Sequence, residues 1–138
     1  MNIVTSFLTR ARSHPELLAV TCASGTLTFA QLAQNAGALA SSLRTGVQLV
    51  EGDRVVLFME NRAAFFEALL ACWMAGLVPV PANAKLHPRE ISLIIKDANA
   101  KLVFTSDTLL DSLLEPLADM TGAVQLVSVQ SHTYTDWL

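Results

Sequence analysis

Two polar segments of this sequence have residue types that could bind a ligand. Thr105-Ser106-Asp107-Thr108 follows an apolar run and opens a helical pattern, so its hydroxyls and free backbone N–H groups could bind an anion. The same residue types cap ordinary helices, and we favour that structural interpretation. Glu60 and Arg62 follow another apolar run, at a position where open α/β sheets place ligands. Opposite charges in a tight turn more often form a solvated local pair, which is our prediction here.

Histidine and cysteine, which act as bases, nucleophiles and metal ligands near neutral pH, are few and scattered. His14 precedes a proline, His87 precedes a predicted helix and His132 lies in the tail. None forms with a nearby Asp, Glu or Cys a spacing that indicates a metal or catalytic pair, so we predict surface or capping roles. For Cys22 and Cys72 we predict two reduced thiols in the core. The sequence therefore assigns no catalytic, cofactor-binding or metal-binding residue.

Glycine-rich phosphate loops are the usual mark of nucleotide binding in α/β proteins. The two strand-to-helix turns predicted over residues 59–62 and 105–108 contain no glycine. A small nucleotide-binding protein of flavodoxin-like build is therefore a disfavoured alternative.

The central part of the chain predicts a strand, a helix and a second strand. Val55 to Met59 is a continuous apolar run with the length of a buried strand. Ala63 to Ala75 follows as a helix with one charge, Glu67, and a glycine stops it. Leu77 to Pro81 is short and marked by prolines, which indicates a strand that soon leaves the sheet. Short links between these elements predict a parallel crossover.

The rest of the chain continues this alternation, which predicts an α/β fold: an open, mainly parallel sheet with helices on both faces, preceded by an N-terminal helix and a β-hairpin. Thr28 and Gln31 form a capping box, and the tail over residues 131–138 shows no clear period. The further predicted elements are a helix over residues 2–12, a hairpin of Leu17 to Cys22 with Thr26 to Leu27, a helix from Thr28 to Leu43, a helix that starts at Pro88 and ends at Asn99 in a left-handed turn, a strand over Leu102 to Phe104, a helix from Asp107 to Met120 that Pro116 must kink or split, and a strand over Val124 to Val129.

Length and composition limit the class of protein. The length of 138 residues predicts a single domain over 1–138. Hydrophobic residues make up 52% of the chain and charged residues 15%, whereas an average soluble domain has about 25% charged residues, so this chain is more apolar than average. Some of that apolar surface is therefore expected to face a partner or a missing neighbour. A net charge of −3 without a basic cluster excludes a nucleic-acid binder. The longest apolar run, Ala68 to Val80, is shorter than the ~20 residues of a membrane span, and the start of the chain carries no signal-like leader, so we expect a cytoplasmic protein.

Several motifs together resemble the N-terminal region of the AMP-forming acyl-CoA synthetases, the adenylate-forming ligases. They are Leu27-Thr28-Phe29 with Leu32, Gly52-Asp53-Arg54-Val55, Ala71 to Val80 with its Ala-Gly turn and Val-Pro pair, Asn83 to Ile91 with its Pro-x-Glu helix start, Leu102-Val103-Phe104, and the tail Tyr134 to Trp137. Their order and spacing cover essentially the whole chain. The chain departs from the family at His87, where Thr or Ser is more frequent. Asn83, where the peptide-synthetase branch more often carries Asp, favours the fatty-acyl or aryl-CoA ligase branch.

The resemblance implies a two-step reaction for a parent enzyme that uses ATP, Mg and CoA. A carboxylate attacks the α-phosphorus to give an acyl-adenylate and pyrophosphate, and the CoA thiol then displaces AMP. The family's Pro-Lys-Gly loop, adenine-binding stretch, ribose-binding Asp and catalytic Lys lie downstream of the matching region, so no family catalytic residue maps onto this sequence. We expect an inactive N-terminal subdomain fragment that binds no cofactor and whose partner is the remainder of the parent enzyme. Because that remainder would cover part of the sheet, we also expect self-association into a homo-oligomer through the apolar face that is left exposed. The alternative is a stand-alone, non-catalytic binding module with the same fold.

Overall fold

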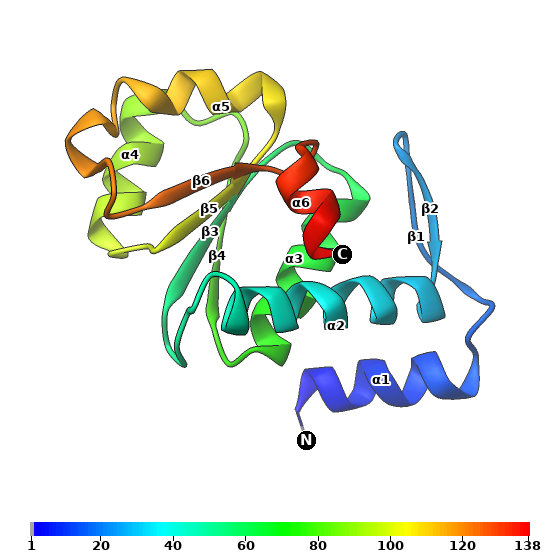
Figure 1. The fold of residues 1–138 in the computed structure, drawn as a ribbon. Helices are drawn as coiled ribbons and strands as arrows, with labels where there is room; N and C mark the ends of the chain where they lie inside the picture. Colours follow the sequence, from blue (N-terminus) through cyan, green and yellow to red (C-terminus); the bar gives the residue numbers. More distant parts are fainter. Residues whose placement is uncertain (1) are drawn as a thin grey trace.

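The computed structural model describes residues 2–138, which form an open parallel sheet with helices on both faces and a separate two-stranded hairpin (Figure 1). The four parallel strands lie in the order β4-β3-β5-β6, and β1 pairs with β2 antiparallel. The predicted fold class is confirmed. The helices are α1 Ile3–Ser13, α2 Phe29–Thr45, α3 Ala63–Met74, α4 Pro88–Asp97, α5 Asp107–Leu114, a 3₁₀ turn Ala118–Met120 and α6 His132–Trp137. The strands are β1 Leu18–Cys22, β2 Gly25–Thr28, β3 Arg54–Phe58, β4 Val78–Ala82, β5 Leu102–Thr105 and β6 Gln125–Ser128.

Strand β3 is continuously apolar because it has a strand on each side and helices above and below. Val56 pairs with Val80 of β4 and with Val103 of β5 in parallel register. Side chains alternate between the faces: Val55 and Leu57 pack beneath α2, α3 and α6, whereas Val56 and Phe58 pack beneath α4 and α5. The result is a three-layer arrangement with one core on each side of the sheet.

A third core joins the N-terminal elements to the rest of the protein. Val20 of β1 packs with Leu32 and Ala36 of α2 and with Leu70 of α3, and Phe7 of α1 lies against the same cluster. This burial stabilises a hairpin that would be marginal alone. Figure 1 shows α1 running alongside α2, with the hairpin at the start of α2.

The helix boundaries follow local signals. The Thr28 hydroxyl accepts from the Gln31 N–H at 3.2 Å, and the Gln31 side chain accepts from the Thr28 N–H at 2.9 Å, so the predicted capping box at the start of α2 is present. The His87 ring likewise accepts from the Arg89 N–H at 3.2 Å, and Glu90 accepts from the His87 N–H at 2.8 Å. His87 therefore caps α4, as predicted.

Two helices end in the same left-handed motif. After α3, Gly76 has a φ of +76°, and the Leu77 N–H bonds the Cys72 carbonyl at 2.8 Å. After α4, Asn99 has a φ of +49°, and the Ala100 N–H bonds the Ile95 carbonyl at 3.1 Å. These are Schellman endings, which Gly and Asn favour because they tolerate positive φ.

The C-terminal part agrees with the sequence at Pro116 and differs in the tail. Helix α5 stops at Leu114 and a 3₁₀ turn follows, so the predicted helix over 107–120 is split. The tail forms the short helix α6, which the sequence analysis missed. Its apolar contacts are made by Tyr134 and Trp137 alone, whose rings lie 5.6 and 6.3 Å from the ring of Phe104. Two apolar positions are too few to produce a readable helical period.

Within residues 2–138, no helix has the length and apolar character that a membrane span requires.

Candidate functional site

The carboxyl ends of the parallel strands form the edge where an open α/β sheet places ligands. An open cleft of about 900 Å³ lies at the ends of β3 and β4, between the hairpin and the start of α3. Its wall is mainly apolar, with three charged side chains, Glu60, Arg62 and Lys85. The other lining residues are Val20, Thr21, Cys22, Met59, Asn61, Phe65, Phe66, Pro81, Ala82, Asn83 and Ala84.

Glu60 connects the turn after β3 to the start of α5. Its Oε1 accepts a 2.6 Å hydrogen bond from the Thr108 hydroxyl, and the Ser106 and Thr108 hydroxyls lie 3.1 Å apart. Hydrogen bonds from the hydroxyls of Ser106 and Thr108 lower the pKa of the Glu60 carboxyl, because they stabilise its charged form. The start of α5 is therefore already in contact with an anion, the carboxylate of the protein's own Glu60.

This arrangement corrects the prediction for residues 105–108. Ser106 occupies the N-cap position of α5, but its side chain makes no capping hydrogen bond. The Asp107 N–H is instead bonded at 3.1 Å by the side-chain oxygen of Gln130, from the loop after β6. Asp107 in turn accepts a hydrogen bond from the Ser128 hydroxyl. The Ser106 side chain therefore does not cap the helix, and the Ser106 and Thr108 hydroxyls are engaged within the protein, whereas the Thr105 hydroxyl is buried and has no hydrogen-bond partner among residues 2–138.

Glu60 and Arg62 form the predicted local pair, with Arg62 Nη2 3.4 Å from Glu60 Oε2. The pair is less solvated than predicted, because the Arg62 side chain is only 21% exposed against 45% for Glu60. The Arg62 Nε is buried and has no hydrogen-bond partner among residues 2–138.

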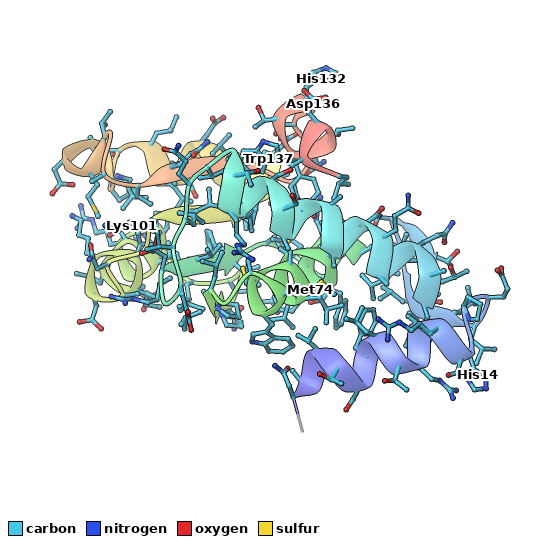
Figure 2. All side chains as sticks on the ribbon, turned by 60° about the horizontal axis from the view of Figure 1, so that its bottom comes forward. His14, Met74, Lys101, His132, Asp136 and Trp137 are labelled. Atoms are coloured by element: carbon cyan, nitrogen blue, oxygen red, sulfur yellow. The ribbon has the colours of Figure 1, made fainter. Side chains whose placement is uncertain are left out.

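The histidines occupy separate parts of the protein. His14 lies at the end of α1 and His132 at the start of α6, far apart in Figure 2, and His87 caps α4. The His14 Nδ1 is 2.8 Å from the Ser13 hydroxyl and 3.2 Å from an Arg10 nitrogen, on an exposed surface. Across the described part of the chain, no three His, Cys, Asp or Glu side chains are grouped in a way that could hold a metal ion.

The two cysteines are both free thiols, as predicted, but only one lies in the core. Cys72 is buried in α3, and burial raises the pKa of its thiol to about 12. Cys22 is half-buried on the wall of the cleft, which corrects the prediction of a core position. A hydrogen bond with the Ser24 hydroxyl, at 3.0 Å, lowers the pKa of Cys22.

A buried carboxylate outside the cleft was missed by sequence reasoning. Glu67 of α3 is 5% exposed and receives hydrogen bonds from Tyr134 Oη at 2.7 Å and Asn35 Nδ2 at 2.8 Å. Burial and the adjacent Glu67 carboxylate raise the pKa of the Tyr134 phenol, which keeps it protonated as a donor. The signal in the sequence was the single charge within an otherwise apolar helix. This network joins α2, α3 and α6 and is structural rather than part of the cleft.

The carboxyl edge of the sheet can now be compared with the nucleotide sites of other α/β proteins. The chain has a parallel sheet covered on both faces and an open cleft at its carboxyl edge, but its strand-to-helix turns have no glycine cradle for phosphate. The hydroxyls that could hold an anion are engaged by Glu60. The described residues therefore form an open cleft at the carboxyl edge, and the hydroxyls at the start of α5 are occupied by the protein's own carboxylate.

Comparison with known proteins defines the family. The AMP-binding enzyme model matches residues 7–137, and the chain belongs to that family. It is 35% identical over 103 residues to a fatty acid–[acyl-carrier-protein] ligase, ScoC, of Streptomyces coeruleorubidus, which covers 75% of this chain and 19% of that protein. It is 34% identical over 99 residues to a long-chain-fatty-acid–CoA ligase of Haemophilus influenzae, and this match covers 72% of this chain and 18% of that protein.

Solved structures of similar proteins contain the same fold. The N-terminal domain of FACL13 from Mycobacterium tuberculosis superposes with a TM-score of 0.86 at 28% identity, over 99% of this chain and 35% of that one. A benzoate CoA ligase from Burkholderia xenovorans superposes with a TM-score of 0.87 at 26% identity, over 94% of this chain and 26% of that one. The chain thus spans about a fifth of the curated relatives and about a third or less of these solved chains.

Proposed function

We propose that residues 1–138 are a single N-terminal subdomain of an AMP-forming acyl-CoA synthetase and act as a scaffold in that enzyme. The observation that carries the proposal is the family match over residues 7–137, combined with a coverage of about a fifth of the relatives' length. The parent enzyme converts a carboxylate and ATP to an acyl-adenylate and pyrophosphate, and then forms a thioester with CoA. The names of the relatives, together with Asn83, favour a fatty-acyl or aryl substrate.

The cofactors ATP, Mg and CoA belong to the parent enzyme in this proposal. The chain supplies no Pro-Lys-Gly loop, and the described residues include no cluster of metal-ligating side chains. Its own residues fold the sheet, cover both faces and shape one wall of the cleft. The partner is the remainder of the enzyme, and the location is the cytoplasm.

The proposal predicts that the chain alone does not activate carboxylates. Purified protein mixed with ATP, Mg and a panel of fatty and aromatic acids is expected to release pyrophosphate at the background rate, because the positioning and charge-stabilising groups of adenylation are absent from its sequence. An active relative assayed in parallel is the positive control. Pyrophosphate release above background, dependent on both protein and acid, would overturn the proposal.

The coding sequence separates a subdomain from a stand-alone module of the same fold. An open reading frame that continues past Leu138 into a Gly-rich Pro-Lys-Gly loop supports the subdomain. A stop codon directly after Leu138 supports the stand-alone binding module, and contradicts the scaffold role.

A further inference from the structure

The cleft at the ends of β3 and β4 has an aromatic wall that is partly exposed. Phe65 and Phe66, in the first turn of α3, pack edge to face with ring centroids 5.6 Å apart, and Phe66 is 45% exposed. Val20 of the hairpin and Met59 after β3 belong to the same wall. A contiguous apolar surface of this kind marks a place that another group covers.

The charged groups of the cleft leave one cation unpaired. The Glu60 carboxylate is engaged by the Thr108 hydroxyl and by Arg62, whereas Lys85 forms no ion pair within residues 2–138. Helix α3 starts on the cleft wall, and its N-cap residue, Arg62, makes no side-chain capping hydrogen bond. The N–H groups at a helix start carry partial positive charge. The cleft is therefore complementary to apolar side chains accompanied by a carboxylate.

The cleft does not arise from the end of the sequence. Both of its walls, the hairpin and α3, lie within this chain, and Val20 of β1 and Leu70 of α3 belong to one buried cluster that holds them together. An occupant must therefore enter between two elements that are already packed, and it need not extend the sheet.

We infer that, in the parent synthetase, the chain that follows residue 138 places an apolar segment with an acidic side chain in this cleft. The inference rests on the proposed function. The matched regions cover 19% and 18% of two relatives, so most of such a protein lies outside residues 1–138 and is available to fill the cleft. The acidic side chain pairs with Lys85, and the apolar side chains cover Phe66.

Cys22 provides a natural probe of this cleft. Its thiol is free and half-buried on the cleft wall, and the hydrogen bond with the Ser24 hydroxyl lowers its pKa, which favours the reactive thiolate. Cys72 is buried, and burial raises the pKa of its thiol to about 12. Within residues 1–138, a thiol reagent therefore modifies Cys22 first, at a rate that depends on access to the cleft.

The experiment compares N-ethylmaleimide labelling of Cys22 in residues 1–138 and in the protein translated from the complete reading frame. Mass spectrometry of the Cys22 peptide gives both rates. Cys22 is expected to react at least about tenfold more slowly in the longer protein, because its cleft is filled. In urea the two rates should be equal, which is the control.

The alternative occupants give different results. Equal native rates in the two proteins would overturn the inference. Protection within residues 1–138 that grows with protein concentration would identify a second copy as the occupant, and protection of the longer protein only after a fatty or aromatic acid is added would identify a ligand. Either result would also overturn it. A reading frame that stops after Leu138 is a failure of the proposed function, and the coding sequence shows it independently of any labelling.

Two variants of Lys85 test the charge pairing. Lys85→Glu opposes the acidic side chain, so the ratio of the two Cys22 labelling rates is expected to move towards one. Lys85→Arg keeps the charge and should keep the ratio of the natural sequence. Circular dichroism checks that each variant is folded. A ratio that Lys85→Glu leaves unchanged would contradict the assignment.

Discussion

Glu60 connects two segments at the carboxyl edge of the parallel sheet. Its carboxylate bonds the Thr108 hydroxyl at 2.6 Å and lies 3.4 Å from the Arg62 guanidinium. The turn after β3 is thereby fastened to the start of α5. Hydrogen bonds from the Ser106 and Thr108 hydroxyls, with a smaller contribution from the Arg62 charge, stabilise the charged carboxylate, so the pKa of Glu60 in the folded protein lies below the ordinary value of 4.5.

The first prediction concerns the pH dependence of this contact. A carboxyl whose pKa is lowered on folding contributes stability above 4.5 and loses it as the pH falls through the lower folded value. Glu60→Gln is therefore expected to lower the free energy of unfolding at neutral pH by about 1 kcal/mol or less, since the side chain is nearly half exposed. Urea unfolding of both proteins at decreasing pH should show the difference shrinking, with the exposed Glu16→Gln as control. A difference that does not change with pH would contradict the prediction.

At the scale of elements, the connection from α3 to β4 sets the geometry of the crossover. Gly76 adopts a φ of +76° and reverses the chain two residues after α3 ends at Met74. A Cβ added there would lie 3.3 Å from Glu51 Cγ, which is a tight contact with a flexible side chain. The backbone conformation is therefore the main reason why glycine is needed at this position.

The second prediction compares two glycines. Gly76→Ala is expected to lower the free energy of unfolding by about 1–2 kcal/mol, because an L-residue is strained at positive φ. Gly37 lies in the middle of α2, where an added Cβ meets nothing within 4 Å. Gly37→Ala should therefore raise the stability by about 0.5–1 kcal/mol. Urea unfolding measures both changes, and equal effects of the two substitutions would disprove the conformational explanation.

At the scale of the whole molecule, the buried Glu67 carboxylate ties the C-terminal helix to the first half of the chain. The helix α6 lies beside α2 on the same face of the sheet (Figure 1), and the Trp137 carbonyl accepts a 3.1 Å hydrogen bond from the Ser42 hydroxyl. Tyr134 reaches Glu67 from α6, and Asn35 reaches it from α2. A buried carboxylate is tolerated here because both oxygens are hydrogen-bonded.

The third prediction tests this connection with a double-mutant cycle. Tyr134→Phe is expected to lower the free energy of unfolding by about 1–3 kcal/mol, because Glu67 loses one of its two donors while remaining buried. Combined with Glu67→Gln, the two changes should be less than additive by about 1 kcal/mol, the sign of direct coupling. Thr135→Ala, on the exposed side of α6, is the control and should change stability by less than about 0.5 kcal/mol. Strict additivity of the two core substitutions would contradict the contact.

Much of the fold could be predicted because its signals act over a few residues. The capping box of Thr28 and Gln31, the left-handed ending at Asn99 and the split at Pro116 each depend on neighbours along the chain. The apolar run of β3 likewise predicted that this strand is buried on both faces of the sheet. The motif order also indicated the family that the model over residues 7–137 defines.

The sequence by itself thus determined the order and type of the main elements, because propensity, capping and apolar periodicity are local properties. Only the tertiary structure decided what the polar residues near the sheet do. Glu60 and Thr108 are 48 positions apart, and Glu67 and Tyr134 are 67 apart. Such partners become neighbours through the packing of the sheet and helices, and no local pattern records them. The same reason applies to α6, because its two aromatic residues pack against Phe104 of β5, which is distant from them along the chain.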